Sequence, residues 1–245
     1  MDGLTTAVAS GLRSRTEALE LLANNLANAG SAGYKADRES YSTYFSPDSL
    51  DGPAGSYPTF SPVVDRNWID QSQGPTIPTG NSLDFAISGS GYFVVDTANG
   101  PMCTRAGSFR LGTTGVLENL SGDRLRGKDG KPIKLNPAQE FTVDGSGVFR
   151  QAGQVVGQLE LLDFADRSQL VKQGSTYFRY EPSNSFPVAT PQIQQGQLEG
   201  ANFHPAEAAV RLVGVMRQFE ALQRALSLAG EMNRRTLEDV ARVKD

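Results

Sequence analysis

Residues able to carry out catalysis are scarce in this sequence of 245 residues. It has one histidine, His204, and one cysteine, Cys103. Zinc sites are usually built from several His and Cys ligands, so the sequence predicts no zinc site of this kind. A Ser-His-Asp triad would have to use His204, which stands beside Pro205, and the sequence has no G-x-S-x-G nucleophile elbow. These observations argue against zinc-dependent and serine-dependent hydrolysis.

Two other patterns imitate catalytic sites. Residues 122–129 follow the phosphate-loop pattern G-x-x-x-x-G-K-[ST] until the last position. That position should hold Ser or Thr to ligate Mg²⁺, whereas Asp129 would repel phosphate, so we predict a hairpin turn here. Asp163 and Asp166 could in principle form a glycosidase pair, but we interpret them as turn residues. The sequence therefore favours a protein that is not an enzyme, with no catalytic residue, cofactor or metal ligand.

The composition indicates a globular chain without a basic surface. Hydrophobic residues make up 38% and charged residues 20%, and the formal net charge is −4 with a pI of about 5.2. Residues 41–103 hold six Asp and one Arg. Nucleic acids bind basic surfaces, so we do not expect a nucleic-acid partner. The lone Cys103 cannot form a disulfide within the chain, and we expect it to be a small buried residue.

The N-terminus carries no sign of a cleaved leader. Met1-Asp2-Gly3 lacks the basic start and the apolar core of a secretory signal. No run approaches the ~20 apolar residues of a membrane helix. Taken alone, these features indicate a cytoplasmic protein.

A helix is predicted over residues 4–28. Apolar residues recur at helical spacing and line one face. They are Leu4, Val8, Leu12, Leu19, Leu22 and Leu26. Asn24, Asn25 and Asn28 crowd the last turn, where amides compete for backbone hydrogen bonds and favour termination. Two glycines in residues 29–35 then allow a helix stop and a turn.

A second helix is predicted over residues 206–240. Pro205 suits a first turn, and Glu207 favours the positive end of a helix. A heptad seam then steps by three and four. Its members are Ala209, Leu212, Met216, Phe219, Gln223, Leu226, Gly230, Asn233, Leu237 and Val240. Because ~35 residues of helix span ~50 Å, we expect this seam to need the first helix as an antiparallel partner. The predicted contacts are Leu12, Leu19, Leu26, Leu212, Phe219 and Leu226.

Residues 31–80 differ from both helices because six prolines punctuate them. This density excludes a long helix and a central strand. We expect an extended arm with one or two short strands, such as around residues 60–68. Trp68 is interpreted as a packing anchor.

Residues 81–199 are predicted to form an antiparallel β domain. Residues 83–87 and 91–95 alternate with period two. Further short apolar runs lie at 108–111, 115–117, 141–143, 147–149, 158–162 and 177–180. The turn pairs between them are Asn99-Gly100, Asp129-Gly130 and Asp144-Gly145. The predicted fold is therefore a multidomain α+β protein. It has a helical assembly domain of paired, coiled-coil-like terminal helices from residues 1–30 and 200–245, an arm over 31–80 and a central all-β domain over 81–199.

Several stretches resemble the bacterial flagellar rod and hook proteins. The N-terminal pattern is A-N-N-L-A-N at 23–28 followed by S-x-G-Y-K at 31–35. The central patterns are N-x-L-D-x-A-I-x-G-x-G-Y-F-x-V at 81–95, T-R-x-G-x-F at 104–109, G-x-L at 115–117, G-x-L-x-L-x-x-F-x-D-x-x-x-L at 157–170, and K-x-G at 172–174 with Phe178. G-Q-L-E-G-A-N at 196–202 resembles the family's approach to its last helix. Two positions depart from the family: Arg167 replaces a common Pro, and Phe203 replaces a usual Val.

The resemblance implies a structural subunit of the flagellar basal-body rod, the drive shaft that crosses the periplasm. It implies as partners other copies of the chain, other rod proteins and the type III flagellar export apparatus, with export that cleaves no signal. No cofactor, small-molecule substrate or nucleic acid is implied. The implied assembly interface consists of Leu4, Val8, Leu12, Leu19, Leu22, Asn24, Asn25, Leu26, Asn28, Leu212, Met216, Phe219, Leu226 and Leu237.

Length separates members of the family. The chain is too short for a hook subunit with its extra outer domain, whereas the proximal and distal rod subunits both fit. Residues 232–243 resemble the last helix of the distal subunit poorly, which favours the proximal subunit. A secreted β-rich adhesin or binding module is a more remote alternative, which a heptad seam at both ends of the chain disfavours.

Overall fold

The chain divides into two compact units in the computed structural model, which describes residues 3–45 and 60–242. The helical unit takes in residues 1–26, 37–68 and 205–245. The β unit takes in residues 27–36 and 69–204. The stretch that we predicted as a separate arm is thus shared between the units, with its residues 37–68 in the helical one.

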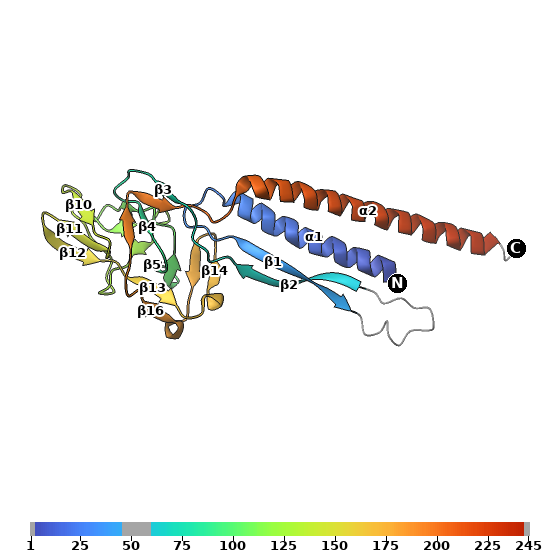
Figure 1. The fold of residues 1–245 in the computed structure, drawn as a ribbon, viewed down its shortest axis with the longest axis horizontal. Helices are drawn as coiled ribbons and strands as arrows, with labels where there is room; N and C mark the ends of the chain where they lie inside the picture. The colour runs from blue at the N-terminus through green and yellow to red at the C-terminus, as the bar shows by residue number, and fades with distance from the viewer. Residues whose placement is uncertain (1–2, 46–59, 243–245) are drawn as a thin grey trace. The chain divides into compact units, whose positions relative to one another are not determined.

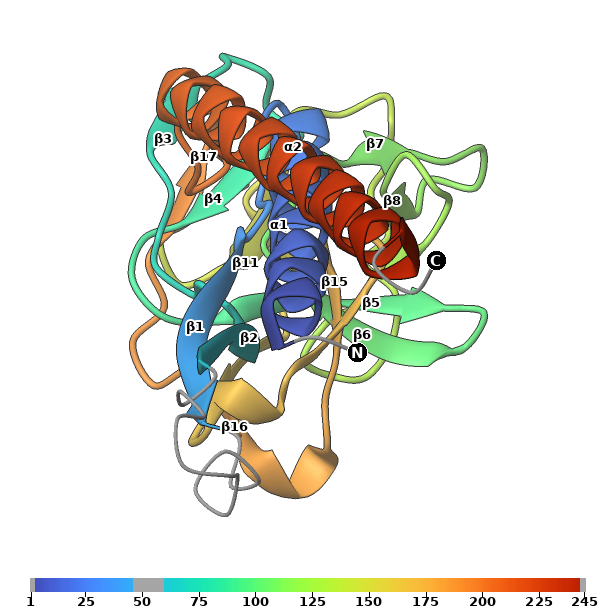
Figure 2. The same cartoon turned by 90° about the vertical axis from the view of Figure 1, so that its right-hand side faces the viewer.

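The helical unit holds two long helices, α1 (Gly3–Ala27) and α2 (Pro205–Arg242). Their bounds differ from the predicted ones by one or two residues, so both helix predictions are confirmed. Figures 1 and 2 show α1 and α2 side by side. In the described residues, no helix is long and apolar enough to cross a bilayer.

A small apolar cluster joins the two helices. Ala18 and Leu22 of α1 are buried with Val215 of α2, and Leu19 and Leu212 pack against them. Farther along, a Cβ atom placed on Gly11 would lie 3.4 Å from a methyl group of Leu222. The residue numbers at these contacts increase along α2, from Val215 to Leu222, while they decrease along α1, from Leu22 to Gly11. The two helices therefore run antiparallel.

The contacting face of α2 is shifted from the predicted seam. Ala208, Val215 and Ala229 are buried, whereas their neighbours Ala209, Met216 and Gly230 are exposed. Leu212 and Phe219 remain half-buried as members of the contacting face. Leu26 and Leu226 were also predicted in the seam, but both are exposed in the single chain. The prediction failed at these positions because neighbouring apolar residues fit helical spacing equally well, and only packing selects between them.

A hairpin completes the helical unit. Strands β1 (Asp37–Phe45) and β2 (Phe60–Ile69) pair in a sheet of their own. The strand predicted around residues 60–68 is confirmed. One or two strands were expected in this stretch, but the place of β1 was not predicted. Proline excludes a central strand, but both strands of a two-stranded sheet are edges, so β2 accommodates Pro62. The interpretation of Trp68 as a packing anchor is wrong, because its side chain is 45% exposed.

The β unit is antiparallel throughout its named strand pairs, as predicted. Its main sheet has nine strands, of which seven follow the order β14-β15-β6-β5-β9-β8-β7, while β13 pairs with β5 and β16. These are β5 (Tyr92–Thr97), β6 (Gly100–Thr104), β7 (Arg110–Leu111), β8 (Leu117–Glu118), β9 (Arg124–Leu125), β13 (Leu161–Phe164), β14 (Val171–Gln173), β15 (Tyr177–Arg179) and β16 (Ser185–Pro187).

Smaller sheets flank this one. β10 (Phe141–Val143), β11 (Val148–Gln151) and β12 (Gln154–Gln158) form a three-stranded sheet. β17 (Ile193–Gln195) pairs with β4 (Phe85–Ile87), and β18 (Gln197–Glu199) pairs with β3 (Thr76–Pro78). Short 3₁₀ turns span Arg167–Gln169 and Pro182–Asn184.

Two apolar clusters fill the β unit. The larger lies around Phe85, Phe93 and Phe149, and the smaller holds Tyr92 and Cys103. Cys103 is buried and free, which confirms its prediction as a small buried residue. Burial raises the pKa of its thiol well above the usual range, so the thiol stays protonated and unreactive.

The predicted turns fall where short hairpins close. Asn99-Gly100 joins β5 to β6, and Asp144-Gly145 joins β10 to β11. Asp129-Gly130 lies within a tight turn closed by a bridge between Arg126 and Pro132, which confirms that the phosphate-loop pattern is a hairpin.

The two candidate glycosidase carboxylates have structural roles. Asp166 is a turn residue as predicted, and its side chain accepts a hydrogen bond from the N–H of Ser168. Asp163 was wrongly predicted as a turn residue. It lies in β13 and forms an ion pair of 2.9 Å with Arg167, the residue that replaces the family's Pro.

Candidate functional site

A buried cluster of three charged side chains lies in the β unit. Glu199 ends β18, Arg105 follows β6, and Lys35 lies in the segment after α1. All three side chains are at most 3% exposed. Each lies in a motif of the family resemblance: Lys35 in S-x-G-Y-K, Arg105 in T-R-x-G-x-F and Glu199 in G-Q-L-E-G-A-N. The fold therefore brings three separate motifs to one point.

Glu199 is the centre of this cluster. One carboxylate oxygen, Oε1, lies 2.5 Å from Lys35 Nζ and accepts a hydrogen bond of 3.0 Å from the N–H of Gly74. The other oxygen, Oε2, accepts a bond of 2.9 Å from Arg105. Charge-assisted bonds of this kind are stronger than neutral ones, and both buried cations share this one carboxylate. Carbonyl groups add to the shell, because Lys35 also donates to Ser72 O and Arg105 to Gly89 O.

Close backbone approaches surround the cluster. The N–H of Gly33 donates to Glu199 O at 2.7 Å. A Cβ atom on Gly33 would lie 2.2 Å from Ala106 N, and one on Gly74 would lie 2.0 Å from Gly200 O. Contacts this short are impossible for a real side chain, so both positions require glycine.

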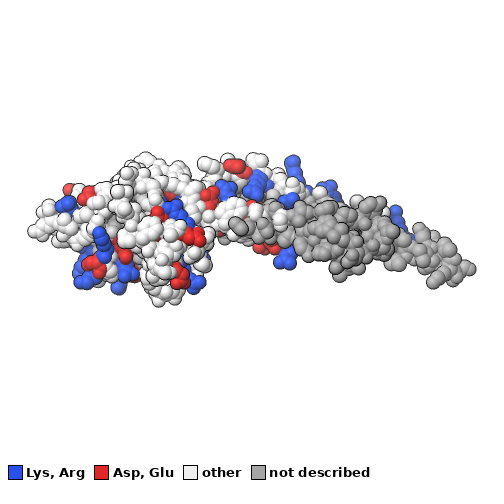
Figure 3. Space-filling model, turned by 60° about the horizontal axis from the view of Figure 1, so that its bottom comes forward, with Lys and Arg blue, Asp and Glu red and all other residues white. Residues whose placement is uncertain are grey.

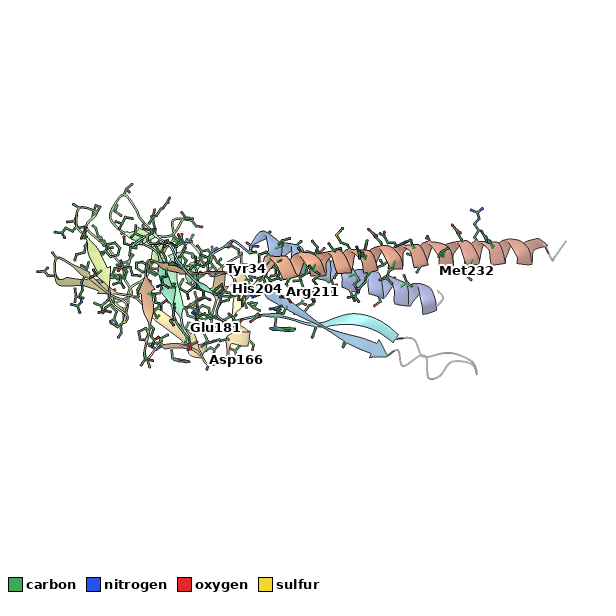
Figure 4. All side chains as sticks on the ribbon, turned by 45° about the horizontal axis from the view of Figure 1, so that its top comes forward. Tyr34, Asp166, Glu181, His204, Arg211 and Met232 are labelled. Atoms are coloured by element: carbon green, nitrogen blue, oxygen red, sulfur yellow. The ribbon has the colours of Figure 1, made fainter. Side chains whose placement is uncertain are left out.

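A second layer of side chains holds the segments that carry the cluster. Asn202 accepts a hydrogen bond from the N–H of Ala36 and donates to Asp70 O. Tyr34, labelled in Figure 4, is fully buried with Ala36 and Ala201, and Phe203 packs against them. Phe203, which replaces the family's usual Val, therefore has a packing role in the β unit, whereas His204 is exposed.

Burial shifts the pKa of two groups at this cluster. Desolvation lowers the pKa of Lys35 from its usual 10.5, and Glu199 opposes the shift. Burial also raises the pKa of Tyr92, whose ring lies 5.1 Å from the Arg105 guanidinium carbon, to about 12. The Tyr92 hydroxyl donates to Gln71 at 2.6 Å, so the phenol is held in its protonated form.

Tyr92 leads to a prediction about alkaline pH. The unfolded phenol ionises near pH 10 and the folded one near pH 12, so the folded state holds more protons in that window. The stabilisation is complete below pH 10 and is lost as the pH rises towards 12. Between pH 8 and 11.5, we expect the free energy of unfolding to fall by about 2 kcal/mol more in the wild type than in Tyr92→Phe.

Urea unfolding of both proteins at the two pH values measures this difference. The lowered pKa of Lys35 acts in the opposite direction, because it makes stability rise with pH, but it is present in both proteins and cancels in the comparison. An equal fall in the two proteins would contradict the assignment to Tyr92.

The charged groups of the cluster are bonded to one another and to backbone groups of the β unit. Each of its charges faces an opposite charge or a carbonyl group. In the described residues, no group of three or more His, Cys, Asp or Glu side chains is placed to hold a metal ion. On the face that Figure 3 shows, basic and acidic side chains are interspersed on the β unit.

The predicted assembly residues fall into different environments within the helical unit. Val8, Leu22 and Asn25 are buried, and Leu12, Leu19, Leu212 and Phe219 are half-buried. Asn24, Leu26, Met216 and Leu226 are exposed. Asn28 belongs to the β unit and is half-buried, and the side chains of Leu4 and Leu237 lie outside the described set. The predicted assembly residues are thus divided between the interior and the surface of the single chain.

Asn25 has a role that the sequence did not indicate. Its amide donates to Asp37 O and accepts from the N–H of Asp37, each at 2.9 Å, so it pairs with the backbone where β1 begins. Nearby, Arg211 of α2 forms an ion pair of 3.0 Å with Glu39 of β1. These contacts attach the hairpin to both helices within the helical unit. Figure 4 labels Arg211 near the start of α2.

The sequence analysis missed Lys35, Arg105 and Glu199 as members of one site. Each lies in a matched motif, but nothing in the motifs shows that they meet. One available signal was a charged residue inside an otherwise small and apolar stretch, as in Leu198-Glu199-Gly200-Ala201.

Two family models match the chain. The flagellar hook protein FlgE/F/G D1 domain matches residues 86–152, and the flagellar basal body rod FlgEFG protein C-terminal region matches residues 194–239. The first match lies in the β unit, and the second covers the end of that unit and most of α2.

Similarity to curated proteins extends over nearly the whole chain. The flagellar basal-body rod protein FlgF of Caulobacter vibrioides is 29% identical over 92% of both chains. FlgF of Mesorhizobium japonicum is 30% identical over 82% of this chain and 83% of its own. The rod protein FlgG of Bacillus subtilis is 26% identical over 91% of this chain and 93% of its own.

Proposed function

Since this chain belongs to the flagellar basal-body rod proteins of the FlgF/FlgG type and is a structural subunit of the rod, we propose that it assembles through its terminal helices. The single observation that carries the assignment is the similarity to FlgF over nearly the full length of both chains. In this proposal, copies of the chain stack helically, and α1 and α2 pair in a coiled-coil-like manner. The stack forms a shaft that transmits torque across the periplasm.

The surface of α2 supports this proposal. Val210, Val213 and Leu228 are 75%, 49% and 60% exposed, and Met216 is 48% exposed. Large apolar side chains gathered on one helix are unfavourable in water and indicate a surface that another molecule covers. We propose that other copies and other rod or hook proteins cover it, and that the predicted interface residues Leu26, Met216 and Leu226 contribute.

Position in the rod is part of the proposal. Identity is 29% with one FlgF and 26% with one FlgG over similar spans, which favours the FlgF-like, proximal position. The FlgG-like distal position is the second candidate, supported by the FlgG match over 91% of the chain. We further propose location in the basal body across the periplasm and delivery by the type III flagellar export apparatus, with no signal cleaved. Family membership favours this function over an adhesin.

Leu26→Asp tests the assembly surface. Leu26 is 36% exposed and lies in α1 beside the buried Leu22 and Asn25, so the variant should leave the β unit folded. Covering a carboxylate with an apolar partner costs several kcal/mol, so we expect loss of rod assembly and of motility in a strain that carries only this variant.

Leu26→Met is the matched control, because it keeps an apolar side chain of similar size at the same position. It should support normal swimming. Normal motility and rod assembly with Leu26→Asp would show that this part of α1 is not an assembly surface.

A further inference from the structure

The chain passes between its two units at four points, and three segments of the β unit carry them. These segments are residues 27–36, the stretch that begins at Ile69, and the stretch that ends at His204. Each contributes to the surroundings of Glu199: the first supplies Lys35, the second Gly74, and the third Glu199 itself. Within the β unit, the ion cluster therefore joins all three segments that continue into the helical unit.

We infer that Glu199 is a positioning residue whose carboxylate fixes these three connecting segments together at one place in the β unit. Lys35 and Arg105 bring two positive charges into a buried site, and Glu199 is the carboxylate bonded to both. Removing that charge leaves two buried cations without a counter-ion, which is unfavourable in a site of low polarity.

The backbone bonds around Glu199 show which segments would be released. Its carbonyl accepts from Gly33 N–H, and its carboxylate accepts from Gly74 N–H. The N–H of Gly200 donates to Pro75 O, and that of Asp70 donates to Ala36 O. These bonds link the three segments pairwise, so opening the cluster exposes amides in all of them.

The charge count ranks the possible variants. The cluster has two cations and one anion in the wild type. Glu199→Gln leaves two cations and no anion, whereas Lys35→Met leaves one neutral pair between Arg105 and Glu199. Glu199→Gln changes the volume of the side chain hardly at all. If charge and not packing holds the three segments together, Glu199→Gln should nevertheless destabilise the β unit more than Lys35→Met does.

The experiment compares the wild-type chain with Glu199→Gln, Lys35→Met and the double variant, by urea unfolding and amide hydrogen exchange. We expect Glu199→Gln to raise the unfolding equilibrium constant of the β unit by roughly 10²–10³-fold, and Lys35→Met by a clearly smaller factor. Adding Lys35→Met to Glu199→Gln should recover at least about tenfold, because it removes one unpaired cation.

Hydrogen exchange provides a readout that a general loss of stability would not give. In Glu199→Gln the amides of residues 33–36, 70–74 and 199–202 should lose protection before those of Val94 and Val95 in the central strand β5. If Glu199→Gln does not fold, hydrogen exchange is measured on Glu199→Asp, whose carboxylate keeps its charge but is one methylene shorter, and the same three segments should lose protection first.

Two results would overturn the inference. One is a Glu199→Gln protein as stable as the wild type, with unchanged protection in the three segments. The other is a double variant whose loss equals the sum of the two single losses, because independent effects of that kind would mean that the charges do not act as one cluster.

Discussion

Gly33→Ala is expected to destabilise the β unit by at least about 4 kcal/mol, at the upper end for single substitutions. Gly33 has a φ of +70°, which side chains other than glycine adopt only at a cost. The added Cβ would also lie 2.2 Å from backbone atoms of Ala106 and Arg105. These backbone atoms cannot move without disrupting the end of β6, beside Glu199. Urea unfolding of the purified chain measures the loss.

Gly30→Ala is the matched control, because it lies three residues earlier in the same run. A Cβ on Gly30 would meet nothing within 4 Å, and its φ is outside the left-handed region. We expect a change of no more than about 0.5 kcal/mol. Equal effects of the two variants would show that the close approach at Gly33 does not constrain the fold.

Val215→Asp is expected to disrupt the pairing of α1 and α2 while Met216→Asp leaves it intact. Val215 is buried against Ala18 and Leu22, so a carboxylate there would be buried among apolar side chains and should cost about 3 kcal/mol or more. Met216 is 48% exposed, so the carboxylate introduced by Met216→Asp would remain in water. Asp has about the same helix propensity as Val and a lower one than Met, so propensity cannot explain a larger loss in Val215→Asp, and such a loss reports on burial.

Hydrogen exchange on the monomer measures this pair of variants. In Val215→Asp, amides of α1 and α2 should lose protection while β5 and β6 of the β unit keep theirs. A similar loss in Met216→Asp would place Met216 in the contact between the helices and restore the seam predicted from the sequence.

Val215 and Met216 also show which features of α2 follow from sequence periodicity and which depend on packing. Sequence periodicity predicted both helices to within two residues, because apolar steps of three and four persist over many turns and Pro205 marks a start. It did not determine which face of α2 meets α1. Val215 and Met216 are adjacent and both apolar, so a choice between them depends on the shape of the partner surface.

The β unit shows the same division. Alternating apolar residues and turn pairs predicted antiparallel strands such as those at 92–97 and 141–143, since the backbone pattern is local. β3, β17 and β18 were not predicted. They are three residues long, and each is formed by pairing with a segment more than 100 residues away.

The site was accessible from the sequence only as separate motifs. Residues 31–35, 104–109 and 196–202 were recognised, and Asn25 was interpreted as a helix terminator. Tertiary structure alone decided that Lys35, Arg105 and Glu199 form one cluster and that Asn25 holds the start of β1. The physical reason is that charge and hydrogen-bond pairing act through space, and Lys35 and Glu199 are 164 positions apart in the chain.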